Sequence, residues 1–105
     1  MLSEIRLIGV SVSEETQPLE IAESELLTGL AKLLVLVYLG KKRKVDVIKA
    51  GLGSSTLYYN LLKGVQFGYV IVRENEIELT EKGKAIAKIL YSALREIEKT
   101  EKSTS

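Results

Sequence analysis

Hydrophobic and polar positions change their spacing several times along the chain, and each change marks a predicted element. Apolar side chains recur at every second position over 3–12, which predicts a strand or an extended arm. A polar connector ending in Pro18 follows. Residues 19–39 then take on helical spacing, with Gly29 expected to weaken or divide the helix and Gly40 to end it. The second part of this helix is apolar on nearly every side, as in a helix buried at the centre of a small domain.

The middle of the chain predicts two more helices joined by a glycine turn. Residues 45–50 form a short predicted helix, and Gly51-Leu52-Gly53 is the turn that follows it. The next helix begins at once, because Ser54 or Ser55 can serve as its N-cap by accepting a hydrogen bond from a first-turn N–H group. Glycine weakens a helix interior, so Gly64 leaves the end of this helix open, and we expect Gly68 to lie beyond it.

The last third of the chain predicts a hairpin and a long helix. β-Branched side chains indicate strands over 69–73 and 77–79, and the tight connection at 74–76 joins them. Thr80 then caps a helix that we expect to run to about Lys99.

These elements together predict one mainly α-helical domain with a small β-hairpin, which is an α+β fold. A chain of 105 residues with 46% hydrophobic side chains is enough for one compact core. The expected organisation is an N-terminal strand or arm with its connector over 1–18, the folded domain over 19–101, and a disordered tail over 102–105.

Composition excludes several kinds of chemistry. The chain has no cysteine and no histidine, which excludes a thiol nucleophile, a Ser-His-Asp triad, a zinc finger and a disulfide. The loop over 50–56 superficially resembles a phosphate-binding loop but lacks the lysine and the preceding strand of a P-loop. We therefore expect no enzyme activity, no metal and no cofactor.

Hydropathy indicates no membrane segment. The longest nearly uncharged stretch, 26–40, contains Lys32 and is shorter than the roughly 20 residues that cross a bilayer. No signal peptide is visible at the N-terminus, so a cytoplasmic location is the expectation.

Charge is unevenly distributed although the net charge is only +1. Lysine and arginine concentrate over 40–73, where Asp46 is the one acidic residue, while acidic side chains dominate 1–39 and slightly exceed the basic ones over 74–105. A basic segment flanked by acidic ones favours a single surface that binds a polyanion. The alternative is that the run at 41–44 is a solvated loop.

The order of these elements resembles the winged helix-turn-helix domain. Gly51-Leu52-Gly53-Ser54-Ser55-Thr56-Leu57-Tyr58-Tyr59-Asn60-Leu61-Leu62, followed by Gly68-Tyr69-Val70, is similar to the turn, recognition helix and first wing strand of MarR-like and PadR-like regulators. Within it, Thr56-Leu57-Tyr58 resembles the opening of the PadR-type recognition helix, and Leu79-Thr80-Glu81-Lys82-Gly83-Lys84 is similar to the segment that closes the wing.

The resemblance covers about 27–99 and implies double-stranded DNA as the partner and a homodimer as the working unit. Three features depart from the family pattern. Asn60 stands where an apolar residue is usual, Gly64 stands where a core leucine is expected, and the wing tip at 73–76 has one cation and two anions. An acidic tip would repel phosphates, so we expect little affinity from the wing.

A helix over 54–63 can read the major groove if its inner side is seated on the domain. With Leu57 and Leu61 as the inner edge, Tyr59 and Asn60 become the expected base contacts, and an asparagine amide can pair with adenine through two hydrogen bonds. Leu62 also faces outward, toward either a thymine methyl or another protein surface. The alternative role for the tyrosine rings is packing against the wing or against a dimer partner.

We expect the lysines of the turn at 41–44 to hold phosphates without specifying sequence, and the first helical turn of 54–63 to favour a phosphate as well. The expected DNA-binding residues are Lys41, Lys42, Arg43, Lys44, Lys49, Ser54, Ser55, Thr56, Tyr58, Tyr59, Asn60, Lys63 and Arg73.

The last helix carries an apolar stripe that predicts a dimer interface. Its members are Ile86, Ile89, Leu90, Ala93, Leu94 and Ile97. One edge of such a stripe can close the core while the other meets a partner, but all of it could also pack inside one subunit.

Taken together, the sequence favours sequence-specific, homodimeric transcriptional regulation on double-stranded DNA. Two alternatives stay open: a winged helix used for protein contact, and an architectural chromatin protein of low sequence specificity.

Overall fold

The structure is a computed structural model that describes residues 18–104. The predicted strand or arm over 3–12 lies outside the described residues. In chain order the elements are α2 (Pro18–Ala22), α3 (Gly29–Tyr38), α4 (Lys44–Lys49), α5 (Ser54–Gln66), β2 (Val70–Arg73), β3 (Glu76–Leu79) and α6 (Glu81–Thr104). A mainly helical chain with one antiparallel hairpin and a long last helix confirms the α+β class. None of the described helices is both long and apolar enough to cross a membrane.

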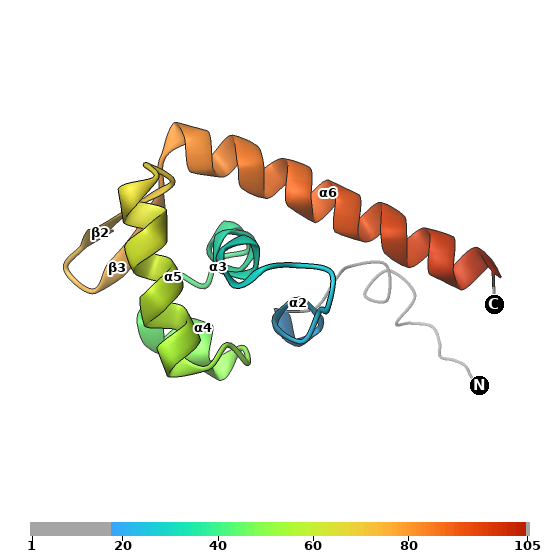
Figure 1. Cartoon of the computed structure of the whole chain (residues 1–105), viewed down its shortest axis with the longest axis horizontal. Helices are drawn as coiled ribbons and strands as arrows, with labels where there is room; N and C mark the ends of the chain where they lie inside the picture. Colours follow the sequence, from blue (N-terminus) through green and yellow to red (C-terminus); the bar gives the residue numbers. More distant parts are fainter. Residues whose placement is uncertain (1–17, 105) are drawn as a thin grey trace.

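Helix α3 lies at the centre of the molecule, with α2, α5 and α6 around it (Figure 1). Five consecutive side chains, from Leu33 to Val37, are buried, which explains why this segment is apolar on every side. The chain is not helical over 23–28, so the helical segment expected over 19–39 is divided into two helices near Gly29, as its sequence predicts. The break lies before Gly29 because Thr28 caps α3, its Oγ1 accepting a hydrogen bond from Ala31 N at 3.2 Å.

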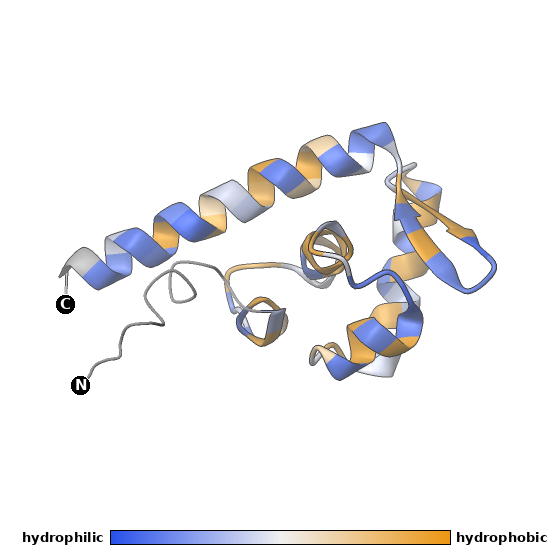
Figure 2. Cartoon of the chain, turned by 180° about the vertical axis from the view of Figure 1, so that it is seen from behind, coloured by the Kyte–Doolittle hydropathy of each residue, from blue (hydrophilic) through white to orange (hydrophobic). Residues whose placement is uncertain are grey.

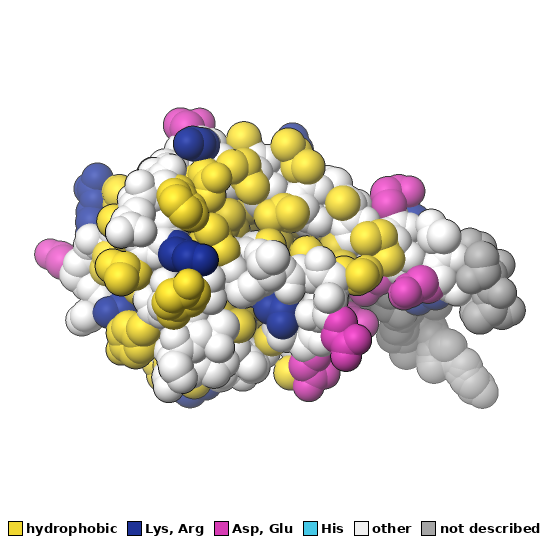
Figure 3. Space-filling view, viewed as in Figure 1, with side chains coloured by type: hydrophobic (Ala, Val, Ile, Leu, Met, Phe, Trp, Pro, Cys, Tyr) yellow, Lys and Arg dark blue, Asp and Glu magenta, His cyan; other side chains and the backbone are white. Residues whose placement is uncertain are grey.

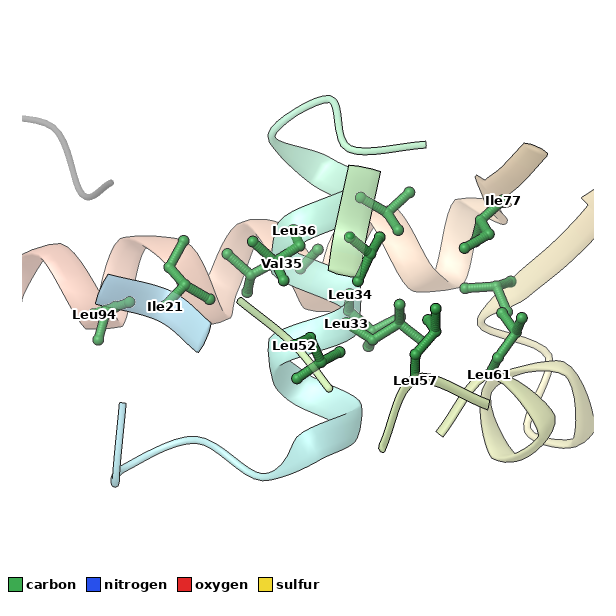
Figure 4. Close-up of a cluster of buried hydrophobic side chains, with 14 residues drawn as sticks. Ile21, Leu33, Leu34, Val35, Leu36, Leu52, Leu57, Leu61, Ile77 and Leu94 are labelled. Atoms are coloured by element: carbon green, nitrogen blue, oxygen red, sulfur yellow. The ribbon is translucent and has the colours of Figure 1, made fainter. Parts of the chain in front are cut away.

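The core is one cluster around α3 to which every neighbouring element contributes (Figure 4). Ile21 comes from α2, Ile77 from β3 and Leu94 from α6, and all three are buried. Leu57 and Leu61 of α5 point into the same cluster, as their spacing predicts. Hydropathy mapped on the ribbon shows α3 almost uniformly apolar, whereas α6 alternates between polar and apolar positions along its length (Figure 2).

Helix α5 continues past Gly64 to Gln66, and Gly68 lies beyond it as expected. Gly64 is buried at the crossing with β2, where a Cβ atom would lie 3.0 Å from a methyl carbon of Val70. The glycine therefore permits a close approach of the hairpin to α5, which is a packing role rather than a helix stop.

The hairpin closes with the expected tight turn. Arg73 pairs with Glu76, and the two residues between them have positive φ, 46° for Glu74 and 71° for Asn75. Two consecutive positive φ angles define the two-residue turn that matches the twist of antiparallel strands.

A third chain segment joins the hairpin, which no local pattern in the sequence predicts. Arg43 forms an isolated antiparallel bridge with Glu76, and Ile77 N donates a hydrogen bond to Lys42 O at 2.6 Å. The backbone of the turn at 41–44 is therefore fixed to the free edge of β3, while the side chains of Lys42 and Arg43 are exposed.

Helix α6 begins at an N-cap that is held by hydrogen bonds on both sides. The Thr80 hydroxyl accepts a hydrogen bond from Gly83 N at 3.0 Å and donates one to Gly68 O at 2.6 Å, which confirms Thr80 as the cap. The helix extends beyond the expected end at Lys99 and includes Lys102, so the predicted disordered tail over 102–105 is helical as far as Thr104.

Replacing Gly83 with alanine should destabilise the fold. A Cβ atom at Gly83 would overlap the backbone carbonyl oxygen of Tyr69, and a backbone atom cannot turn aside as a side chain can. We expect Gly83→Ala to lower the free energy of unfolding by about 2 kcal/mol, the usual cost of overpacking. Lys88→Ala, at an exposed position of the same helix, should change it by less than about 0.5 kcal/mol in the same urea titration. Equal stability of the two variants would contradict this packing.

Candidate nucleic-acid interface

The connection between α4 and α5 sets the position of α5. Gly51 has a φ of 121°, and a Cβ atom there would also approach Ala22 and Leu19 of α2 to 3.0 Å. Leu52 follows as a buried side chain that ties the turn to the core. The turn therefore depends on a glycine conformation that other residues rarely adopt.

The amino end of α5 is open. Its N-cap is Gly53, which makes no side-chain hydrogen bond to the helix, so the prediction of a serine cap at Ser54 or Ser55 is wrong. Both serines lie inside the first turn with Thr56, and all three are exposed. First-turn N–H groups without a side-chain acceptor, together with the positive end of the helix dipole, favour an anion at this position.

Helix α5 has a buried inner side and an exposed outer side. Ser55, Tyr59 and Leu62 follow one another at spacings of four and three residues, and we call them the outer stripe. Tyr59 is 61% exposed and Leu62 63% exposed, while Tyr58, at the flank of the stripe, is 54% exposed.

Asn60 is not on the outer side, so its prediction as a base contact is wrong. The residue is 7% exposed, its Nδ2 donates a hydrogen bond to Thr56 O at 2.8 Å, and its amide packs against Gly29 of α3. A Cβ atom at Gly29 would overlap that amide. The signal was present in the sequence, because the inner spacing of Leu57 and Leu61 also places Asn60 inward.

Two lysines lie over the tyrosine rings of α5. Lys44 Nζ lies 5.1 Å from the centroid of the Tyr58 ring, and Lys63 Nζ lies 4.7 Å from that of Tyr59. Both distances are within the range of cation–π attraction. The first residue of α4 and the flank of α5 that carries Tyr58 are therefore side by side.

The other residues of the turn at 41–44 lie in different surroundings. Arg43 Nε donates a hydrogen bond to Asp46 Oδ2 at 3.1 Å, which lowers the pKa of the Asp46 carboxyl and raises that of Arg43. Lys42 lines a groove formed by α3, β3 and α6, and none of the described residues that line it comes from α5. Lys41 is half-buried. Within the turn at 41–44, Lys44 is the residue whose ammonium group lies over an α5 ring.

The two remaining predicted cations occupy different positions. Lys49 is exposed in the last turn of α4, on the element that packs against α5. Arg73 at the hairpin end is 3.7 Å from Glu78 Oε1, and both line a surface hollow together with Glu74 and Glu76. The hairpin tip is therefore mostly acidic, as its sequence indicates.

Acidic side chains gather at the other end of the molecule. A groove between the segment after α2 and the later part of α6 has apolar side chains in it and four carboxylates around it, namely Glu20, Glu25, Glu98 and Glu101. In Figure 3 acidic side chains are visible over α2 and the later part of α6, and others lie at the hairpin end and near the start of α6. The charge distribution thus favours a polyanion at the α4 and α5 end and disfavours it at the other.

The predicted dimer stripe on α6 splits into two parts. Leu94 is in the core, and Ile86 and Leu90 pack against it, so these three side chains serve their own subunit. Ile89 is 67% exposed, Ile97 is 37% exposed and Ala93 is exposed. Only this second group is available to a partner.

No family model matches the chain, and no curated protein or solved structure is significantly similar to it. The basis for a functional proposal is therefore the arrangement of its elements and side chains.

Replacing Asn60 tests whether its side chain stabilises the fold or contacts a base. We expect Asn60→Ala to lower the free energy of unfolding by about 1 kcal/mol, because a partly buried hydrogen bond is lost. The affinity of the folded protein for duplex DNA should stay within about twofold of the wild type, a difference well below that of one lost base contact. Urea unfolding and fluorescence anisotropy measure the two quantities. Unchanged stability together with weaker binding at one base pair would restore the base-contact hypothesis.

Proposed function

We propose that the protein is a winged helix-turn-helix protein that binds double-stranded DNA by inserting α5 into the major groove. The observation that supports this most is the outer side of α5, which is exposed, rich in hydroxyl groups and flanked by Lys44 and Lys63. In this proposal α4 and α5 are the helix-turn-helix, and the hairpin is the wing.

The dimensions of α5 suit a groove. Its 13 residues span about 20 Å at 1.5 Å per residue, and the amino-terminal two-thirds would cover the roughly 12 Å width of the major groove. The open first turn would meet a phosphate at the groove edge. Lys44, Lys49 and Lys63 would contact the backbone, which positions the helix without reading sequence.

The wing would add little to the affinity. Its tip has Glu74 and Glu76 beside Arg73, and that arginine already faces Glu78. Two carboxylates near a phosphate would oppose binding, so the affinity in this proposal comes from α4 and α5.

The working unit would be a homodimer formed through α6. Ala85, Ile89, Ala93 and Ile97 are exposed and recur at every fourth position, which gives one apolar stripe along the helix. Two subunits joined in this way would present two copies of α5 to two half-sites, and a sequence-specific regulator would use that symmetry.

Salt dependence tests the phosphate contacts. Three lysines per subunit give about six contacts per dimer, so the logarithm of the association constant should fall against the logarithm of salt concentration with a slope of about −5. Lys44→Gln combined with Lys63→Gln should reduce the slope to about −2, whereas Lys88→Gln on α6 should leave it unchanged. Anisotropy titrations over a salt series measure these slopes, and a wild-type slope near zero would count against the proposal.

The dimer has a separate test. Ile89 is outside the core cluster, so Ile89→Glu should preserve the fold while placing a charge in the proposed interface. Sedimentation equilibrium should then report a dimer for the wild type and a monomer for the variant, with Lys88→Glu as the control at an exposed neighbouring position. A wild-type monomer at tens of micromolar would remove the dimer from the proposal.

A second candidate is protein docking through the same helix. The carboxy-terminal part of α5 and the residue after it expose apolar side chains, with Val65 46% and Phe67 49% exposed. Such a surface also suits a protein partner. Failure to bind random duplex DNA at low salt would favour this candidate, and equal affinity for all duplexes would instead favour an architectural protein of low specificity.

A further inference from the structure

We propose that α5 selects thymine-rich duplex DNA by contacting the 5-methyl groups of thymine, with Leu62 as the residue that sets this specificity. The inference rests on the proposed function, because it requires the outer stripe to lie in the major groove. It adds which base is recognised and by which chemistry.

Leu62 lies on the side of α5 that would face the bases of the major groove. It is 63% exposed and lies in line with Ser55 and Tyr59 on the outer stripe. From Ser55 to Leu62 the helix rises about 10 Å, which fits within the roughly 12 Å width of the major groove. A leucine has no hydrogen-bonding group, and the thymine methyl is the apolar group that base pairs present in this groove.

The side chains that usually discriminate bases are missing from the outer stripe. Asn60 turns its amide inward to Thr56 O. Gln66 is exposed, but it lies about 16 Å along the helix from Ser55, beyond the width of the groove.

The remaining polar groups near the stripe discriminate weakly. Lys63 lies over the Tyr59 ring, from which it can reach a phosphate. The hydroxyl groups of Ser55 and Tyr59 can donate or accept, and a serine hydroxyl pairs with more than one base. Within the outer stripe, Leu62 is therefore the side chain with a preference for a single base.

Replacing thymine with uracil removes the 5-methyl group and leaves the hydrogen-bonding groups of the base unchanged. The probes are two duplexes of about 20 base pairs, long enough for two half-sites, one of alternating adenine and thymine and one with uracil in place of every thymine. We expect the wild-type protein to bind the thymine duplex more tightly by about fourfold for each methyl group contacted, the usual effect of burying one such group. Anisotropy titrations at one fixed salt concentration give the ratio.

Variants then assign the preference to Leu62. Leu62→Ala should weaken binding to the thymine duplex and leave the uracil duplex unaffected, so that the two affinities become equal. Val65→Ala removes another exposed apolar side chain of α5, outside the outer stripe, and should retain the wild-type ratio. Because Leu62 is exposed, its replacement leaves the core cluster intact.

The possible failures are distinguishable. Equal wild-type affinity for thymine and uracil duplexes, or a ratio that survives Leu62→Ala, overturns this inference and leaves the proposed function standing. Absence of binding to either duplex at low salt overturns the proposed function and the inference together.

Discussion

Helix α3 is enclosed by the other elements, and their positions follow from this enclosure. A helix with five consecutive buried side chains, Leu33 to Val37, must be covered on every side, and α2, α5, α6 and the hairpin provide that cover. For α5 the consequence is a fixed rotation about its own axis. Leu57 and Leu61 face α3, so Ser55, Tyr59 and Leu62 face solvent. The surface proposed to bind DNA is thus the reverse side of the surface that stabilises the core.

The same packing also fixes where the basic side chains of the turn at 41–44 lie. Attachment of Lys42 and Arg43 to the edge of β3 fixes the start of α4, and Lys44 comes to lie over Tyr58 of α5. Arg43 is held by Asp46 instead of projecting freely. A basic run that looks uniform in the sequence therefore divides into residues with different surroundings, of which Lys44 is the one placed beside the exposed side of α5.

Local patterns predicted those parts of the structure that depend on local physics. The inner leucines of α5, the tight hairpin turn and the Thr80 cap follow from helical period, turn geometry and a hydroxyl near free N–H groups. Tertiary packing decided the rest. Asn60 is buried because Gly29 leaves room for its amide, and that requires knowing which helices cross. Likewise, the sequence of α6 shows an apolar stripe, but tertiary packing decides that Leu94 faces inward, beside Ile21 of α2, and Ile89 outward.

Residue-resolved NMR during titration with duplex DNA would show whether α5 is the surface that binds DNA, because each backbone amide reports its own surroundings. We expect the largest chemical-shift changes at Ser54, Ser55, Thr56 and Tyr59, with Lys44 also affected, and no change at the amides near the acidic groove at Glu25. Changes concentrated on α6 or around that groove, with the first turn of α5 unaffected, would contradict this expectation.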